Sequence, residues 1–331
     1  MPTTTDTGGP DPLSTMIRTA PTIGLDDAYQ FCAQSARSHY ENFNVGGWIT
    51  PRDKLPHVHA IYAWCRMVDD LGDEVNPEQE PTQPASDGRI DSTVSQHRLD
   101  RLDWWESELD LVYSGQPTHP VNVAIQHTVA RFEIPKEPFR RLIHANRLDQ
   151  GAGRFATLND VLDYCTYSAN PVGHLYLYLF GYSDPERQGL ADNTCTALQL
   201  TNFWQDVSRD YHERGRMYLP QQDMARFGAT ESDIASGHAS NEFRALLSHE
   251  CEYARQLFRD GAPLVHSLEP AARLPVALFT RGGVAVLDAI RNQSYDVLTA
   301  RPSLSKSKKA RLLASALLRS KMGLGYGLPS N

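Results

Sequence analysis

The chain has 331 residues, 40% of them hydrophobic, and a formal net charge of −8. This length and composition support one large folded domain or two smaller ones, with a sizeable core. The negative charge and the lack of basic segments interleaved with aromatic residues argue against a nucleic-acid-binding protein. The five cysteines are widely scattered and form no CxxC pair, which is typical of reduced thiols in a cytoplasmic protein without a zinc site or a disulfide framework.

Both ends of the chain are predicted to be tails. Residues 1–22 are rich in Thr, Gly and Pro and lack the basic and apolar segments of a signal peptide, so we expect them to be disordered. Residues 323–331 form a short C-terminal tail. No window reaches 18 uninterrupted apolar residues, so we expect no transmembrane helix. Residues 23–322 remain as one folded domain of a cytoplasmic protein, for which a peripheral contact with a membrane is left open.

Apolar residues recur with the period of an α-helix along most of the chain. In order, the predicted helices span residues 25–40, 54–74, 99–112, 121–132, 139–148, 158–167, 172–180, 186–211, 241–266, 273–299 and 306–318. The polar stretch 76–97 contains three prolines and is predicted to be an exposed loop. Asn170-Pro171 indicates a kink or a boundary. No alternating segment of strand length stands out, so the fold is predicted to be all-α.

A row of polar side chains lies near the end of the helix predicted over residues 186–211. Asn202, Asp206 and Asp210 recur every four residues, so on a helix they stack on one face, about 6 Å apart per step. Like charges at this spacing destabilise a helix by a few tenths of a kcal/mol. A solvated helix face is the common explanation for one such pair. Here the row lies in an apolar helix, which favours a bound cation as its counter-charge.

A second acidic row, Asp69 and Asp73, ends the helix predicted over residues 54–74, and arginines such as Arg66 and Arg216 accompany the two rows. Magnesium is commonly held by one or two carboxylates together with substrate phosphates. Two facing rows therefore predict a clamp in which two or three Mg²⁺ ions and the arginines bind a diphosphate. Such a clamp makes diphosphate a good leaving group, and an apolar pocket beyond it would house a hydrocarbon chain and shield a carbocation.

These segments resemble the signatures of the squalene/phytoene synthase family. The first reads Tyr62-Ala-Trp-Cys-Arg66-Met-Val-Asp69-Asp70-Leu-Gly-Asp73. The second reads Gln199-Leu-Thr-Asn202-Phe-Trp-Gln-Asp206-Val-Ser-Arg-Asp210, followed by Gly215-Arg216-Met-Tyr218-Leu-Pro220. The resemblance extends from about residue 25 to about residue 320. It implies an all-α, single-domain bundle of the isoprenoid-synthase type around a central apolar cavity, and Mg²⁺-dependent ionisation of a prenyl diphosphate lipid.

The resemblance also implies roles for individual residues. Metal binding would fall to the two rows: Asp69, Asp73, Asn202, Asp206 and Asp210. Diphosphate binding would fall to Arg66, Arg216 and Gln199. The residues expected near the reacting carbons are Tyr62, Tyr164 and Tyr218, with Asn170 as a candidate for positioning water. For the tyrosines and arginines the plain alternative is packing or a surface position, for Asn170 a structural amide at the Pro171 kink. Asp70 and Glu74 are expected to face solvent.

Three departures from the common family pattern resemble one bacterial branch, hydroxysqualene synthase of hopanoid pathways. Asn202-Phe-Trp-Gln-Asp206 replaces Asn-Ile-Leu-Arg-Asp, which puts Gln205 where a phosphate-binding arginine often stands. Ser168-Ala-Asn-Pro-Val-Gly173 replaces Ala-Gly-Thr-Val-Gly, and residues 41–45 and 55–58 also match the branch. That branch ionises presqualene diphosphate and quenches the cation with water, so NADPH is not expected. Functional coupling to a presqualene diphosphate synthase and to a squalene-forming oxidoreductase is a further implication.

Other functions remain open at this stage. Within the family, the enzyme would condense two farnesyl diphosphates to presqualene diphosphate, squalene, dehydrosqualene or a phytoene-type product. A non-catalytic scaffold relative would be expected to lose carboxylates that are intact here. A head-to-tail elongation enzyme uses a doubled aspartate in both rows, which Asp206-Val-Ser-Arg-Asp210 lacks. The basic helix at residues 306–321 either rests on an anionic membrane or, as is more common, packs on the bundle with its lysines in water.

Overall fold

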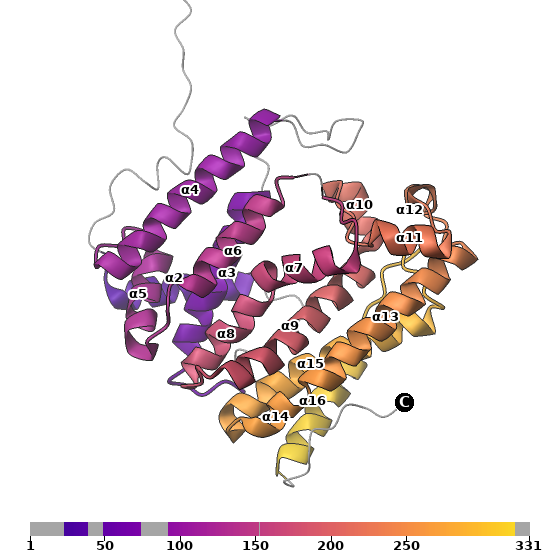
Figure 1. Ribbon diagram of the computed structural model, residues 1–331. Helices are drawn as coiled ribbons and strands as arrows, with labels where there is room; N and C mark the ends of the chain where they lie inside the picture. Colours follow the sequence, from indigo (N-terminus) through magenta and orange to yellow (C-terminus); the bar gives the residue numbers. More distant parts are fainter. Residues whose placement is uncertain (1–22, 39–48, 74–91, 152, 322–331) are drawn as a thin grey trace, which may run out of the picture.

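The computed structural model describes residues 23–38, 49–73, 92–151 and 153–321, and these form a bundle of α-helices (Figure 1). In chain order the helices are α2 (Leu25–Ser38), α3 (Leu55–Asp73), α4 (Ser92–Ser114), α5 (Pro120–Phe132), α6 (Glu137–Leu148), α7 (Leu158–Ser168), α8 (Asn170–Leu179), α9 (Pro185–Gln205), α10 (Val207–Arg214), α11 (Gln221–Phe227), α12 (Glu231–Ser236), α13 (Asn241–Gly261), α14 (Pro263–Ser267), α15 (Pro270–Asn292) and α16 (Lys306–Lys321). Within these residues the only β-type pairing is a single parallel bridge between Arg154 and Met217. The all-α, single-domain prediction is confirmed.

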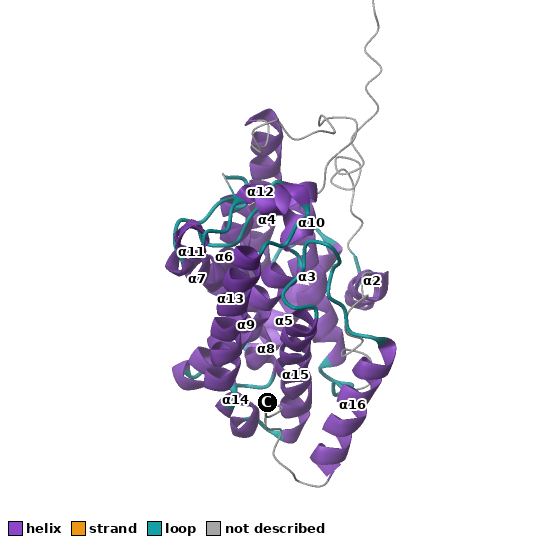
Figure 2. Ribbon diagram, turned by 90° about the vertical axis from the view of Figure 1, so that its right-hand side faces the viewer, coloured by secondary structure: helices purple, strands orange, loops and turns teal. Residues whose placement is uncertain are grey.

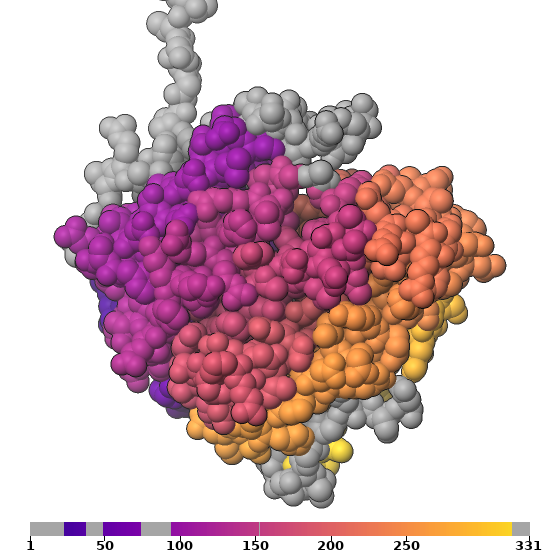
Figure 3. All heavy atoms as spheres, in the orientation of Figure 1, coloured from indigo at the N-terminus to yellow at the C-terminus, as the bar shows by residue number. Residues whose placement is uncertain are grey.

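Helix α9 runs through the middle of the bundle, with α7 and α8 beside it and α13 and α15 on its other flank (Figure 1). The N-terminal helices pack around a separate aromatic core, in which the fully buried Trp64 lies edge-on to Phe139 with ring centroids 4.8 Å apart. The space-filling view shows α4–α6 and α11–α13 on opposite sides of the face formed by α7 and α8 (Figure 3). The bundle thus places α3 and α9, which carry the two acidic rows, in its interior.

A cavity of about 260 Å³ lies between α3, α8, α9, α14 and α15. Its lining is almost entirely apolar, and includes Ile61, Cys65, Leu177, Leu198 and Val276. This is the central apolar cavity that the family resemblance implies. In the described part of the chain, no helix combines the length and the apolarity needed to cross a membrane.

Several predicted boundaries are wrong. The helix predicted over residues 186–211 is interrupted at Asp206, whose φ of −108° and ψ of 14° end α9 and begin α10. The helix predicted over 241–266 is divided at Ala262, before Pro263, and the one predicted over 273–299 already ends at Asn292. In each case tertiary contacts or a proline override a helical apolar pattern.

The polar loop predicted over residues 76–97 is too long at its C-terminal end, because α4 begins at Ser92. Val94 and Arg98 lie one turn apart and are buried, so this polar segment does carry an inward face. The short helices α11 and α12 were not predicted. The rest of the polar loop and the two predicted tails, residues 1–22 and 323–331, lie outside the described residues.

Candidate active site

Each acidic row continues a stripe of residues that lines the apolar cavity. On α3, Val58, Tyr62 and Cys65 line the cavity, and Asp69 and Asp73 follow at the same spacing. On α9 the same pattern runs from Ala191 through Cys195 and Leu198 to Asn202 and Asp206. Each helix therefore lines the cavity with mainly apolar side chains and carries its acidic row at the end of that lining.

Asp73 and Asp206 also stand at the C-terminal ends of α3 and α9. Asp73 is the last residue of α3, and Asp206 directly follows α9. The helix macrodipole places partial negative charge at a C-terminus, so a carboxylate there is disfavoured by about 0.3–1 kcal/mol. Neither helix carries a basic residue in its last turn to offset this charge. Asp206 and Asp210 also lie at the N-terminal end of α10, where the macrodipole favours a carboxylate, so the added need for a cation falls on Asp73.

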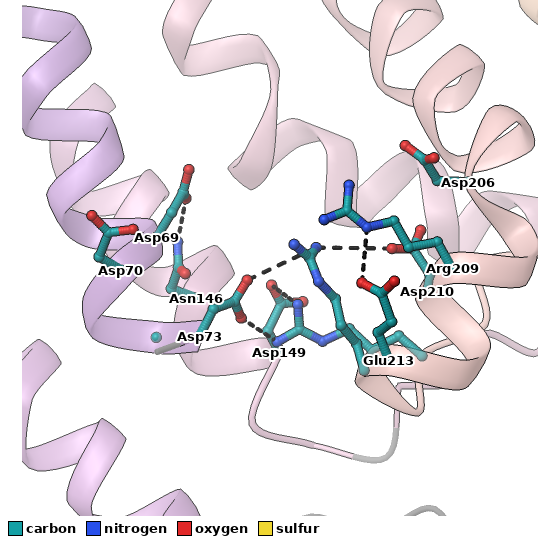
Figure 4. Close-up of polar contacts among 12 residues, drawn as sticks. Asp69, Asp70, Asp73, Asn146, Asp149, Asp206, Arg209, Asp210 and Glu213 are labelled. Carbon is teal, nitrogen blue, oxygen red and sulfur yellow. Dashed lines mark hydrogen bonds and ion pairs between the residues drawn. The ribbon is translucent and has the colours of Figure 1, made fainter. Parts of the chain in front are cut away.

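The two rows face each other, and arginines from the α10 region join them (Figure 4). Arg216 Nη2 lies 2.8 Å from Asp73 Oδ1. Arg214 Nη1 lies 3.9 Å from Asp73 Oδ2 and 3.8 Å from Asp210 Oδ1, so it stands between the rows. Gly215, with φ of 63°, ends α10 in the left-handed conformation and turns the chain so that Arg216 points back to the site. The structure thus brings Asp73, Asp210 and Arg216 together.

Asp69 lies on the same side of the site, against α6. Asn146 Nδ2 is 3.5 Å from Asp69 Oδ1. A Cβ on Gly72 would come within 2.5 Å of Asn146 Oδ1, so the glycine allows α6 to approach α3 this closely. Asp69 is solvent-exposed, although atoms of the neighbouring helices crowd its carboxylate. This desolvation and the charge of Asp73 raise the pKa of Asp69 to about 7.

Asp206 is held by Arg301, from the segment between α15 and α16. The Arg301 guanidinium binds both carboxylate oxygens, with Nη2 2.9 Å from Oδ2, while Asn202 Nδ2 donates to the same Oδ2 at 2.9 Å. The Gln205 side-chain amide holds this segment through two hydrogen bonds. Its nitrogen donates to the Pro302 carbonyl, and its oxygen accepts from Arg301. Arg301 thus supplies the positive charge that Gln205 does not.

An aromatic and polar cluster closes the site beside Arg216. Tyr164 donates its hydroxyl hydrogen to Asp149 Oδ2 at 3.0 Å, and Arg216 Nη1 lies 3.5 Å from the same oxygen. Burial raises the pKa of Asp149 to about 6, although Arg216 opposes the shift. Phe203 stacks on Tyr218 with ring centroids 3.6 Å apart and planes 6° apart. A pocket of about 280 Å³, lined by aromatic and charged side chains, reaches this cluster.

The remaining predicted residues lie in different places. Tyr62 lines the apolar cavity, and Gln199 is half-buried on α9, one turn before the second row. Arg66 Nη2 lies 2.6 Å from Asp70 Oδ1. In this structure Arg66 therefore forms an ion pair within α3 and does not lie beside Arg216 at the acidic rows. Asp70, expected to face solvent, is thus half-buried and paired.

Asn170 is buried at the start of α8, and its amide oxygen accepts a hydrogen bond of 2.9 Å from Thr196 Oγ1. This bond ties α8 to α9 beside the Pro171 boundary. A structural amide accounts for the contact, and the water-positioning role is not needed to explain it.

In the described residues, no three Asp, Glu, His or Cys side chains converge closely enough to form a metal site on their own. The donor set nevertheless suits Mg²⁺, because the facing carboxylates are oxygen ligands and Mg²⁺ is usually shared with substrate phosphates. Asp69 and Asp73 would hold it on one side, and Asn202, Asp206 and Asp210 on the other. Arg301 already binds both oxygens of Asp206, so Mg²⁺ would compete with it for this carboxylate.

Sequence reasoning missed three residues of this site: Asn146, Asp149 and Arg301. Asp149 directly follows the apolar helix α6, which is a weak signal for a role at a helix end. Asn146 and Arg301 carry no recognisable signal, because their partners are 77 and 95 residues away in the chain.

Comparisons with known proteins agree with this geometry. The chain matches the squalene/phytoene synthase family over residues 36–308. It is 30% identical to a phytoene synthase from Arthrospira platensis, over 89% of this chain and 94% of the relative. The crystal structure of squalene synthase HpnC from Alicyclobacillus acidocaldarius is 41% identical, with a TM-score of 0.73, and covers 82% of this chain and 96% of that chain. A ligand-bound dehydrosqualene synthase shares the fold, with a TM-score of 0.77 at 24% identity, over 90% of this chain and 98% of that chain. The chain belongs to the squalene/phytoene synthase family.

Proposed function

We propose that this enzyme ionises presqualene diphosphate in a Mg²⁺-dependent reaction and captures the resulting cation with water, releasing hydroxysqualene and diphosphate. The observation that carries the proposal is the placement of two facing acidic rows at the helix ends above an apolar cavity. A diphosphate and a hydrocarbon joined in one molecule fit these two halves. The 41% identity to a protein described as squalene synthase HpnC favours a squalene-type product over the phytoene of the 30% identical relatives.

In this proposal each half of the site has a separate task. Mg²⁺ bound between the rows would neutralise the negative charge that develops on diphosphate as the C–O bond breaks. Arg214 stands between the rows and Arg216 lies against Asp73, so both would bind the remaining phosphate oxygens. Tyr62 lines the apolar cavity, where its ring would stabilise a carbocation, and the apolar lining keeps out stray water.

The final step forms a C–O bond between water and the rearranged cation, and the bound water then loses a proton. No hydride donor takes part, so NADPH is not required. Presqualene diphosphate must be supplied by another enzyme, so we propose coupling to a presqualene diphosphate synthase. The alcohol product still carries a hydroxyl, so we also propose coupling to a squalene-forming oxidoreductase that removes it.

A product assay tests the function directly. Purified protein is incubated with Mg²⁺ and presqualene diphosphate without NADPH, and in parallel with farnesyl diphosphate. We expect an alcohol from the first substrate. No turnover of presqualene diphosphate, with farnesyl diphosphate consumed, would instead support the second candidate, head-to-head condensation, which the phytoene synthase relatives favour.

Carboxylate variants test the clamp. Asp69→Ala and Asp206→Ala should each abolish turnover while the circular dichroism spectrum stays helical. Asp70→Asn is the matched control, because Asp70 neighbours Asp69 but pairs with Arg66 outside the row. Unchanged turnover in either alanine variant would remove that residue from the clamp, and equal loss in Asp70→Asn would point to general damage to α3.

A further inference from the structure

A carboxyl group is buried between α11 and α13, outside the site described above. Glu250 of α13 is 0% exposed, and neither of its carboxyl oxygens receives a hydrogen bond from a donor group of the described residues. An ionised carboxylate is costly to bury unless it is paired with a cation and hydrogen-bonded. The buried position of Glu250 therefore has to be explained by the group that it faces.

The group that faces Glu250 is a second acid, Asp223 of α11. Helix α11 packs beside α13, as Figure 2 shows, and buries Met224 in the core that the two helices share. Asp223 lies in the first turn of α11, where a helix favours negative charge, and Arg226 Nη1 is 4.0 Å from its Oδ1. Asp223 is therefore the better place for the negative charge, and the proton falls to Glu250.

A hydrogen bond joins the two carboxyl groups, and it requires a proton on one of them. Burial, the larger cause, and the charge of Asp223 raise the pKa of Glu250 to about 8. Among the described groups no charge from α9 or α15, which also pack on α13, acts on Glu250. The other titratable and charged groups around the pair are Arg226 on α11 and His249, Cys251 and Tyr253 on α13.

The position of α11 matters because the helix directly follows the segment that brings Arg216 to Asp73. The backbone N–H groups of Met217 and Gln221 donate to carbonyls of residues 153–156, which holds this segment along its length. After Gln221 the chain runs on as α11. A movement of α11 away from α13 would therefore pull on the segment that carries Arg216.

We propose that protonated Glu250 is a positioning residue, whose hydrogen bond to Asp223 fixes α11 on α13 and thereby holds the segment that carries Arg216. When Glu250 loses its proton, this hydrogen bond is lost and two negative charges face each other in a buried interface, so α11 separates from α13. The anchoring of α11 stands without the proposed function. Its consequence for diphosphate binding by Arg216 rests on the proposed function.

Hydrogen exchange of the full-length protein, measured against pH and corrected for the intrinsic exchange rate, tests the anchoring. In the open form Glu250 is in water and has its ordinary pKa of about 4.3, so the closed form holds the proton more tightly. The closed form therefore loses stability as the pH rises between the two values. Protection of the α11 amides should fall by up to about tenfold per pH unit from about pH 5 to about pH 8, and then level off. The peptide that contains Arg216 should follow the same profile.

Two variants separate the proton from the packing. Glu250→Gln keeps a donor for Asp223 but cannot ionise, so α11 should stay protected across the whole pH range. Glu250→Leu removes the donor and should lower the protection at every pH. Glu252→Gln is the matched control on α13, because the Glu252 side chain is 60% exposed and pairs with Arg259. It should keep the wild-type profile.

Calorimetric titration with Mg²⁺ and inorganic diphosphate, at both ends of this pH range, connects the anchoring to Arg216. Relative to Glu250→Gln, the wild type should lose affinity for diphosphate at the alkaline end. An equal affinity of the two proteins at both ends would overturn the effect on Arg216. If neither protein binds diphosphate at any pH, the clamp itself is refuted, while the exchange profile still decides whether Glu250 anchors α11.

Three exchange results would overturn the anchoring. One is the same pH profile of α11 in the wild type and in Glu250→Gln. Another is wild-type protection of α11 in Glu250→Leu at acid pH. The third is loss of protection in the wild type on addition of EDTA at neutral pH, which would assign the carboxyl pair to a metal ion instead of a shared proton.

Discussion

Replacing Arg301 with glutamine should increase the affinity of the substrate-free protein for Mg²⁺. In the structure Arg301 occupies both oxygens of Asp206, which we propose as a metal ligand. A metal ion that binds there would compete with the guanidinium for the carboxylate oxygens. Arg301→Gln removes this competitor and leaves the hydrogen bond from Asn202 to Asp206 in place.

The size of the effect follows from the exposure of the pair. The Asp206 side chain is 8% exposed, which would favour a strong interaction, but that of Arg301 is 40% exposed. Solvent screening therefore limits the pair to about 1 kcal/mol. The free energy of unfolding of the metal-free variant should fall by about this amount, and its affinity for Mg²⁺ should rise about fivefold.

Calorimetric titration of Mg²⁺ into the substrate-free protein, with thermal unfolding in its presence and absence, measures both quantities. Arg209→Gln is the matched control, because Arg209 is an exposed arginine on α10 that pairs with Glu213 outside the row. Its charge acts on Asp206 and Asp210, but the structure shows no hydrogen bond from it to either carboxylate, so Arg209→Gln should raise Mg²⁺ affinity less than Arg301→Gln does. Unchanged or weaker Mg²⁺ binding in Arg301→Gln would refute the idea that Arg301 and Mg²⁺ compete for Asp206.

Three further predictions follow from the same structure. Chelation with EDTA should abolish turnover, and added Mg²⁺ should restore it; turnover that survives chelation would exclude the metal clamp. Gly283→Ala should lower the free energy of unfolding by about 1–3 kcal/mol in urea denaturation, because its Cβ would lie 2.3 Å from Phe258 Cζ and 2.9 Å from Leu198 Cδ2; wild-type stability would show that the packing yields. Phe203→Ile should destabilise the protein by about 1–2 kcal/mol through loss of stacking on Tyr218, and should reduce the alcohol share of the products; an unchanged product ratio by mass spectrometry would show that this stacking does not orient the reaction.

The fold and the position of the two acidic rows were predictable because both depend on period. A 3.6-residue repeat identifies a helix, and four-residue spacing puts Asp69 beside Asp73 on one face. The same reasoning failed at Asp206, where the backbone leaves the helix although the apolar pattern continues through it. The break coincides with the arginine bound to the Asp206 side chain, and this contact comes from a distant segment.

The contacts that complete the site could not be read from local sequence. Arg301 reaches Asp206 only because the chain returns after α15, and Asp149 meets Arg216 across a separation of 67 residues. The resemblance named Gln205 as a departure, but only the structure shows that its amide holds the segment that carries Arg301. Local pattern thus predicted the carboxylates, while tertiary structure supplied the cations opposite them.

The most direct test of the central claim is a crystal structure of the protein with Mn²⁺, which gives an anomalous signal, and inorganic diphosphate. The account predicts anomalous peaks between the two rows, within about 2.0–2.3 Å of carboxylate oxygens from both, with diphosphate bridging the ions and Arg301 released from Asp206. Ions bound elsewhere, or diphosphate bound while Arg301 still holds Asp206, would contradict it.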